Sequence, residues 1–172
     1  MTINFRSLAY LPLPPMSDTL SVSLALTALA IPHRVFRHPG PFHSLEQAAQ
    51  ERGQSPEQVV RSIVFRVAKD EYVMALVAGA RQVAWPVLRR HLGQSRVTMA
   101  SEAEVLAATG YERGAVAPFG LPRPMRILLD ESVLIQEEVS LGSGVRGVTI
   151  ILRAEDLRRA LPQAELGNYV ET

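Results

Sequence analysis

Three histidines spaced five residues apart, His33, His38 and His43, are the first side chains with the chemistry of metal ligands, and Glu46 follows them. A zinc site needs three or four ligands that converge on one point, and the chain has no cysteine to complete such a set. A Pro-Gly-Pro segment lies between His38 and His43, so the five-residue spacing does not place the three histidines on one face of an element. We therefore expect histidines with ordinary hydrogen bonds, and neither a metal nor another cofactor.

A serine between two glycines, at Gly142-Ser143-Gly144, could act as an exposed nucleophile. The Gly-x-Ser-x-Gly spacing that presents such a serine on a strand-to-helix turn is absent. The tighter pattern is typical of a turn with outward-facing backbone N–H groups, which is the interpretation we prefer. A serine hydrolase centred on Ser143 stays open as an alternative and predicts labelling by an active-site phosphonate.

The segment from Gly114 to Gly120, with Pro118 near its end, has an unusual backbone path fixed by two glycines and a proline. Such a loop lets a ligand approach the main chain and offers N–H groups to a phosphate or a developing oxyanion. A purely structural turn between two elements explains the same residues, and the pattern alone does not separate the two.

The basic residues are 18 in number against 17 acidic ones, for a net charge of +1. All of them except Lys69 are arginine, whose planar fork suits phosphate. Arg89-Arg90-His91 on a short helix could contact a phosphate backbone, although a solvated helix face explains the cluster equally well. The balanced charge argues against a protein that coats nucleic acid by charge alone.

The composition indicates one globular domain. The chain has 172 residues, of which 47% are hydrophobic and 20% charged, so folding buries about 70% of its surface. That apolar fraction with little net charge excludes a disordered chain. No apolar stretch reaches the ~18 residues of a membrane helix, and residues 1–16 lack a signal peptide's apolar block, so we expect a cytoplasmic protein.

The elements that position these residues alternate between helix and strand. Periodicity, caps and turn residues predict helices over 17–30, 44–52, 86–92, 101–110 and 154–161, with Ser17, Ser44 and Ser101 as N-caps. Strands are predicted over 33–37, 61–68, 72–78, 96–99, 126–129, 134–138 and 147–152. Several connections are hairpin-short, which favours a mixed β-sheet flanked by helices in one α/β domain. We expect this domain over 17–161, after a proline-containing extension (1–16) and before a C-terminal tail (162–172).

Four stretches together resemble the YbaK/prolyl-tRNA synthetase-associated editing domain family. Thr109-Gly110-Tyr111 and the Gly114–Gly120 loop are similar to that family's Thr-Gly-Tyr and Gly-x-x-x-Pro-x-Gly segments. Leu129-Asp130-Glu131-Ser132 resembles its strand-ending Asp-Glu, and Gly144-Val145-Arg146-Gly147 its glycine-rich turn. Residues 56–64 resemble the helix-to-strand entry that carries the family's functional lysine. The resemblance covers roughly residues 20–161.

This resemblance implies a convoluted mixed sheet with a cleft for a 3′-terminal adenosine. It implies a trans-acting aminoacyl-tRNA deacylase that hydrolyses the ester of a mischarged tRNA without a metal. An aminoacyl ester is already activated, so hydrolysis needs mainly an oriented water and stabilisation of the oxyanion. The expected partner is the aminoacylated 3′ end of tRNA, with an aminoacyl-tRNA synthetase as a further candidate and no membrane.

The resemblance also implies a set of site residues. Arg61 stands in the lysine position and would hold the terminal phosphate or the substrate carbonyl, while the backbone of Gly114 and Gly120 would line the acyl pocket. These three are the expected catalytic residues. The expected substrate-binding residues are Phe36, His38, Ile63, Val116, Pro118, Phe119, Ser143, Gly144, Arg146 and Thr149.

Three positions depart from the family pattern. Arg61 replaces the lysine and cannot act as a tunable base, Phe36 replaces a tyrosine, and Thr149 replaces an acidic residue. Lys69 lies in the predicted hairpin turn, so we do not expect it to substitute for the missing lysine. These departures favour an alternative function, a non-catalytic module that binds tRNA ends, a nucleotide or a protein partner.

Overall fold

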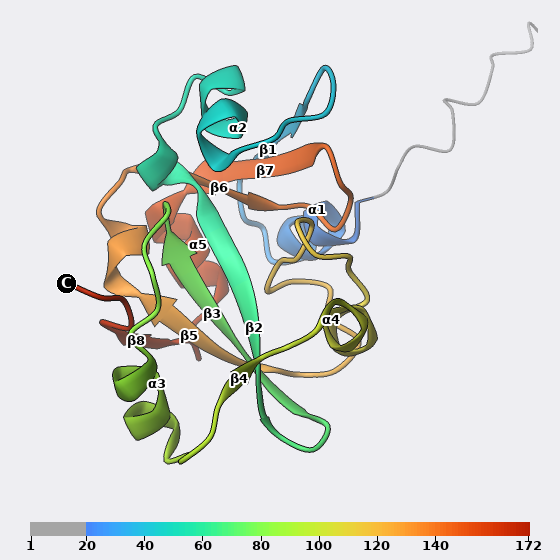
Figure 1. Ribbon diagram of the computed structural model, residues 1–172. Helices are drawn as coiled ribbons and strands as arrows, with labels where there is room; N and C mark the ends of the chain where they lie inside the picture. Colours follow the sequence, from blue (N-terminus) through green and yellow to red (C-terminus); the bar gives the residue numbers. More distant parts are fainter. Residues whose placement is uncertain (1–19) are drawn as a thin grey trace, which may run out of the picture.

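Strand β3 (Glu71–Ala78) is buried from Val73 to Ala78 and forms the middle of a five-stranded sheet in the computed structural model, which describes residues 20–172. The strand order is β4-β2-β3-β5-β8 (Figure 1). The predicted extension over 1–16 and the proposed cap Ser17 lie outside the described residues. The first helix, α1 (Ser21–Ala28), begins after Leu20, so Ser17 is not its N-cap.

The large sheet is mixed, as its short connections predict. β2 (Val60–Ala68) and β3 form an antiparallel hairpin, with Asp70 in the left-handed region at φ 57°. β4 (Thr98–Met99) pairs with β2 in antiparallel orientation, whereas β5 (Arg126–Asp130) lies parallel to β3 and β8 (Glu165–Gly167) lies parallel to β5.

A second, antiparallel sheet has the order β1-β7-β6, formed by β1 (Arg34–Arg37), β7 (Val148–Arg153) and β6 (Glu138–Gly142). A parallel bridge between Val59 and Ser140 joins β6 to the beginning of β2. The two sheets therefore meet at residues 59 and 140, and the space between them opens from that point.

The described residues contain six further helices, and the capping serines that the sequence predicts precede two of them. They are α2 (Leu45–Glu51), η1 (Pro56–Gln58), α3 (Trp85–Leu92), α4 (Glu102–Thr109), η2 (Glu131–Leu134) and α5 (Ala154–Ala160). Ser101 and Glu104 form a reciprocal capping box at α4, and the Ser44 hydroxyl accepts a hydrogen bond from the Gln47 N–H at α2. None of the helices between residues 20 and 172 is long and apolar enough to cross a membrane.

The large sheet has an apolar cluster on each face. One face packs against the small sheet, with Met74 and Leu76 of β3 beside Leu141 and Ile150. The other face, which includes Phe65 and Val77, is covered by α3 through Leu88 and Leu92. Residues of β2 alternate between these two environments, because successive side chains of a strand point to opposite faces.

The predicted strand over 134–138 is wrong. The chain forms the 3₁₀ helix η2 after Asp130, whose carboxylate accepts a hydrogen bond from the Ser132 N–H at 2.9 Å. Ile135 at the helix end is 69% exposed, so the apolar residues that suggested a buried strand are not all buried. The strand of this region, β6, begins at Glu138 instead.

Residues 162–172, expected as a tail, belong to the domain. They contain β8, and Tyr169 is almost fully buried against Phe65, Leu88 and their neighbours. The Tyr169 N–H donates to Asp130 Oδ2 at 2.7 Å, which ties the segment to the end of β5. Short strands that pair with distant residues carry little local signal, and the three-residue β8 is one of them.

Glu165 of β8 is bound to Arg126 of β5, and from this contact we predict that the stability of the fold depends on pH. Hydrogen bonds from Arg126, at 2.5 and 2.7 Å, are the main reason that the pKa of Glu165 falls from 4.5 to about 2, and His91 adds to it. The carboxylate therefore stabilises the fold fully above about pH 4.5, and this contribution is lost as the pH falls toward 2.

We expect Glu165→Gln to lower the free energy of unfolding by about 1 kcal/mol at neutral pH, a value reduced for solvent screening. Urea titrations at pH 7, 5, 4 and 3 should show the difference from wild type shrinking below pH 5. Glu155→Gln, which alters an exposed pair with Arg153, is the matched control and should change little. A difference that is constant with pH would show that the charge of Glu165 is not responsible.

Candidate functional site

A cavity of about 440 Å³ lies between the two sheets, beside the open side of β2. Leu45 and Ala48 of α2 form one wall, and Gly114 and Val116 of the 110–120 loop form another. The floor comes from β2, β6 and β7. The lining residues of these strands are Val60, Arg61, Ser62, Ile63, Val64, Ser140, Leu141, Gly142, Val148 and Thr149.

Strand β2 lines the cavity with an unpaired edge. On that side β2 is joined to β6 through Val59 and to β4 only at Phe65 and Arg66. The Ala100 N–H donates to Val64 O on the same side, so alternation of the main chain places the N–H and C=O of Ser62 there too. An open strand edge offers hydrogen-bonding groups to a ligand.

Ser62 has the one buried side-chain oxygen or nitrogen, among the described residues, without a hydrogen-bond partner. Its Oγ is shielded from solvent in the wall of the cavity. A buried hydroxyl without a partner costs about 1–3 kcal/mol, so natural proteins rarely keep one without a reason. The cavity therefore combines apolar walls with one hydroxyl and one stretch of main chain that are available to a ligand.

The 110–120 loop is built around the phenol of Tyr111. The Tyr111 hydroxyl donates to Phe119 O at 2.7 Å and lies 3.0 Å from Ser21 Oγ. A Cβ on Gly120 would come within 2.5 Å of that hydroxyl, and one on Gly144 within 2.7 Å of the ring. The close packing of Tyr111 against Gly120 and Gly144 thus fixes the backbone path of the loop.

Gly142 brings β6 against the same loop. A Cβ at this position would overlap Val116 O and come within 2.7 Å of Ala115 O. The Gly144 N–H also donates to Ala115 O at 2.9 Å. The cavity wall formed by residues 114–116 therefore depends on the missing side chain of Gly142.

Arg61 takes part in the cavity wall, but its guanidinium is engaged elsewhere. Nε donates to Gly79 O at 2.6 Å, and Nη2 donates to Arg81 O. In the β2–β3 register Arg61 is opposite Val77, so its side chain lies on the face covered by α3. Burial lowers the pKa of Arg61. This geometry does not bring the guanidinium to the Gly114–Gly120 loop.

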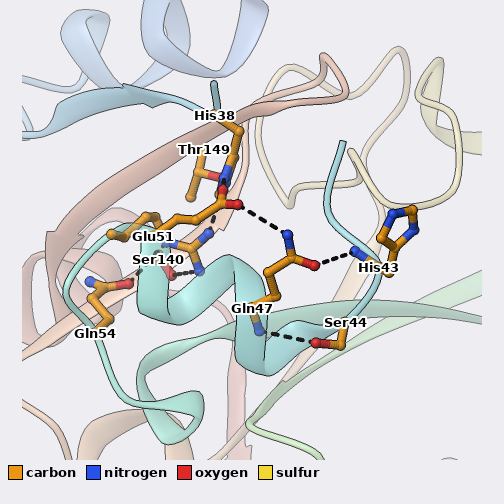
Figure 2. Close-up of polar contacts among 9 residues, drawn as sticks. His38, His43, Ser44, Gln47, Glu51, Gln54, Ser140 and Thr149 are labelled. Carbon is orange, nitrogen blue, oxygen red and sulfur yellow. Dashed lines mark hydrogen bonds and ion pairs between the residues drawn. The ribbon is translucent and has the colours of Figure 1, made fainter. Parts of the chain in front are cut away.

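His38 is the centre of a cluster of polar contacts (Figure 2), and two of its partners, Arg52 and Thr149, line the cavity. Its Nδ1 contacts Glu51 Oε2, and its Nε2 lies 3.0 Å from Arg52 Nη1 and 3.3 Å from Thr149 Oγ1. A guanidinium only donates and a carboxylate only accepts, so Nε2 accepts from Arg52 and Nδ1 donates to Glu51. The hydrogen bond with His38 is the main reason that the pKa of Glu51 is lowered.

The thirteen predicted site residues divide into those that line the cavity and those that do not. Five of the thirteen line the cavity: Arg61, Ile63, Gly114, Val116 and Thr149. Eight do not: Phe36, His38, Pro118, Phe119, Gly120, Ser143, Gly144 and Arg146. Of these, His38 reaches the cavity through Arg52 and Thr149, while Gly120 and Gly144 support the loop.

Ser143 is a structural residue. Its side chain is fully buried, and its hydroxyl lies 2.8 Å from Val148 O and 3.0 Å from Val145 O. It thereby closes the turn before β7. No histidine contacts it within residues 20–172, so the geometry supports the turn and leaves no basis for a serine hydrolase at this position.

The histidines do not converge. His33 bonds Ser23 Oγ and Ile31 O, and His38 bonds Glu51, as ordinary hydrogen-bonded side chains do. Within the described part of the chain, no three His, Cys, Asp or Glu residues are grouped as metal ligands.

Sequence reasoning missed Arg52, Ser62, Ser140 and Gly142. Arg52 was the last residue of a predicted helix and belonged to no motif, and Ser62 was adjacent to Arg61, which stands in the lysine position. The only usable signal was the alternation of β2, which sends residues 61 and 62 to opposite faces. Gly142 was noted only as part of a Gly-Ser-Gly turn.

Comparison with known proteins now assigns the family. The aminoacyl-tRNA editing domain matches residues 39–160 of this chain. The chain belongs to this family. This confirms the family expected from the loop motif, and the mixed α/β fold is confirmed as well.

Individual members of the family agree with this assignment. The multifunctional Ser/Thr-tRNA deacylase ProXp-y of Escherichia coli K12 is 28% identical over 131 residues, which cover 74% of this chain and 78% of ProXp-y. YwhH of Bacillus subtilis is 32% identical over 114 residues, 66% of this chain and 72% of YwhH. A crystal structure described as a proposed trans-editing enzyme for prolyl-tRNA synthetase superposes with a TM-score of 0.80 at 27% identity, covering 88% of this chain and 96% of the other.

The close approach at Gly142 can be tested directly in this editing domain. We expect Gly142→Ala to push residues 115 and 116 out of the cavity wall and to lower the free energy of unfolding by about 1–3 kcal/mol. Thermal and urea unfolding measure the loss. Gly40→Ala is the matched control, since nothing lies within 4 Å of a Cβ at Gly40, and it should leave stability unchanged. Equal stability of both variants would contradict this account of the loop.

Proposed function

We propose that this chain is a trans-acting aminoacyl-tRNA deacylase that hydrolyses the ester of a mischarged tRNA in the cavity beside β2. The observation that carries the proposal is the combination of an open strand edge with the unpartnered hydroxyl of Ser62. Membership of the aminoacyl-tRNA editing domain family and similarity to a Ser/Thr-tRNA deacylase support it.

The reaction requires little from the side chains. A water adds to the ester carbonyl carbon, the bond from that carbon to the ribose oxygen breaks, and the water's proton passes to the ribose oxygen. The products are a free amino acid and an uncharged tRNA. Because the ester is activated, orientation of the water and stabilisation of the oxyanion supply most of the acceleration.

In this proposal the Ser62 N–H, on the open edge, stabilises the oxyanion, and the Ser62 hydroxyl orients the aminoacyl group or the water. Gly114 and Val116 line the acyl pocket with main chain and a small apolar side chain. Arg61 acts indirectly, because its bonds to Gly79 O and Arg81 O hold the end of β3 against β2. Gly120 likewise acts through Tyr111 and the loop.

The proposed partner is the aminoacylated 3′ end of tRNA. The cavity volume, about 440 Å³, suits an amino acid and part of an adenosine rather than a helix of RNA. A protein that acts in trans on charged tRNA would work in the cytoplasm, which is the location we propose, and an aminoacyl-tRNA synthetase is a further candidate partner.

Ser62 provides the sharpest test, because its hydroxyl contributes to the proposed reaction and not to folding. We expect Ser62→Ala to reduce kcat/KM for the best mischarged tRNA substrate about tenfold, the value of one hydrogen bond. Stability should be unchanged or slightly higher, since an unpaired polar atom is removed. Deacylation of a panel of mischarged tRNAs, with urea titrations beside it, measures both.

Ser143→Ala is the matched control for Ser62→Ala. The Ser143 hydroxyl makes hydrogen bonds within the turn, so this variant should be less stable. The molecules that remain folded should hydrolyse the ester at the wild-type rate. Full activity of Ser62→Ala would contradict the proposed role of the hydroxyl. Absence of turnover of every charged tRNA by wild type would contradict the deacylase.

A second candidate, a non-catalytic module that binds tRNA ends, is favoured by one observation. The guanidinium in the lysine position is committed to two main-chain carbonyls, those of Gly79 and Arg81. The two functions differ in one measurement, since the module would bind a charged tRNA and leave its ester intact while the deacylase releases the amino acid.

A further inference from the structure

Arg52 is a half-buried arginine held only by neutral groups. Nε donates to Gln54 Oε1 at 3.2 Å, Nη1 to His38 Nε2 at 3.0 Å and Nη2 to Ser140 Oγ at 3.1 Å. None of the ion pairs among residues 20–172 includes Arg52. Burial is the main reason that the pKa of Arg52 is lowered, and the charge of Glu51 partly opposes this shift.

The neighbouring carboxylate, Glu51, makes its hydrogen bonds with groups other than this cation. Glu51 accepts a hydrogen bond from Gln47 Nε2 at 3.2 Å with one oxygen and contacts His38 Nδ1 with the other. The imidazole thus stands between Glu51 and Arg52, and its second nitrogen accepts from the guanidinium. A structural ion pair would join the two charges directly; here the carboxylate orients the histidine, and the histidine orients the arginine.

The guanidinium keeps donors for a ligand. It has five N–H groups, of which three have partners, so each terminal nitrogen retains one N–H without a partner in the described residues. A guanidinium with an N–H available on each terminal nitrogen can bind two oxygens of a phosphate or carboxylate. Arg52 lines the cavity, so an anion in the cavity can reach it.

The other arginines of the cavity wall are already engaged. Arg61 donates to the carbonyls of Gly79 and Arg81. Arg113 donates to Ala100 O at 3.1 Å and pairs with Glu102 at 3.6 Å, with half of its side chain exposed. Of these three arginines, Arg52 is the one whose partners include neither a carboxylate nor a main-chain carbonyl.

We propose that Arg52, oriented by the Glu51–His38 pair, binds the phosphodiester at the 3′ end of the tRNA. The inference rests on the proposed function, since it places the ester in the same cavity. In a charged tRNA the anion nearest to the ester is the phosphate on the 5′ side of the terminal adenosine. Arg52 is therefore a substrate-positioning cation, and it takes over the role expected for Arg61.

AMP and adenosine are the probes, because they differ by this phosphate alone. In calorimetric titrations of the full chain, wild type should bind AMP about tenfold more tightly than adenosine, the effect of one charge-assisted pair. Arg52→Met should remove the difference and leave adenosine binding unchanged. Arg153→Met, an exposed arginine paired with Glu137 and Glu155, is the matched control and should keep it. An AMP preference that survives Arg52→Met overturns the proposal.

Two further variants separate binding from folding and from orientation. Arg52→Lys keeps the charge without the fork and should retain only part of the AMP preference; a full preference overturns the paired binding of oxygens. Glu51→Gln removes the carboxylate that fixes the imidazole, and it should weaken AMP binding about threefold while shifting the ring-nitrogen resonances of His38. Unchanged AMP affinity in this variant overturns the orienting role. Thermal unfolding verifies that each variant is folded.

Turnover of mischarged tRNA distinguishes this inference from the deacylase itself. Arg52→Met should raise KM with kcat unchanged, and should reduce the slope of log(kcat/KM) against log salt concentration by about 0.7, as the loss of one phosphate contact predicts. A fall in kcat alone would assign Arg52 to the reacting ester and overturn the phosphate role. If wild type deacylates tRNA but binds AMP no more tightly than adenosine, only this inference is overturned. Wild type that prefers AMP through Arg52 and hydrolyses no ester overturns the deacylase only.

Discussion

The close approach of β6 to the 110–120 loop is the constraint on which the candidate site depends. Gly142 lets the carbonyls of residues 115 and 116 lie where a side chain would otherwise be, and Tyr111 fixes the rest of the loop from the opposite side. With the loop in place, the unpaired edge of β2 faces a wall rather than solvent. Main-chain N–H groups then work in a partly dry cavity, where their electrostatic effect is larger than in water.

Few charged side chains take part in this site. The cavity walls are mostly apolar, and the polar groups around Arg52 are an imidazole, an amide and a hydroxyl rather than carboxylates. An ion pair inside the site would compete with a ligand, because breaking it would leave each member as an uncompensated charge in the cavity. Neutral acceptors orient the guanidinium and leave its charge available. The chain's small net charge fits a protein that recognises one anion at one place.

Elements that depend on neighbouring residues could be predicted from the sequence, whereas elements that depend on contacts between distant residues could not. The caps at Ser44 and Ser101 and the hairpin at Asp70 depend on residues within four positions, so they could be read directly. The turn at η2 and the pairing of β8 depend on Asp130, whose two oxygens bind Ser132 and Tyr169. In the site, the glycine loop was predictable from its motif, whereas Ser62 became visible only once its missing partner could be seen.

The direction of Arg61 shows why a position in a motif is not enough to place a charge. Residue 61 is opposite Val77 in the hairpin, and the β2–β3 register decides the face whatever side chain is present. Because residue 62 takes the cavity face of β2, a cation for the cavity has to come from another element. The end of α2 provides it, in the half-buried guanidinium of Arg52.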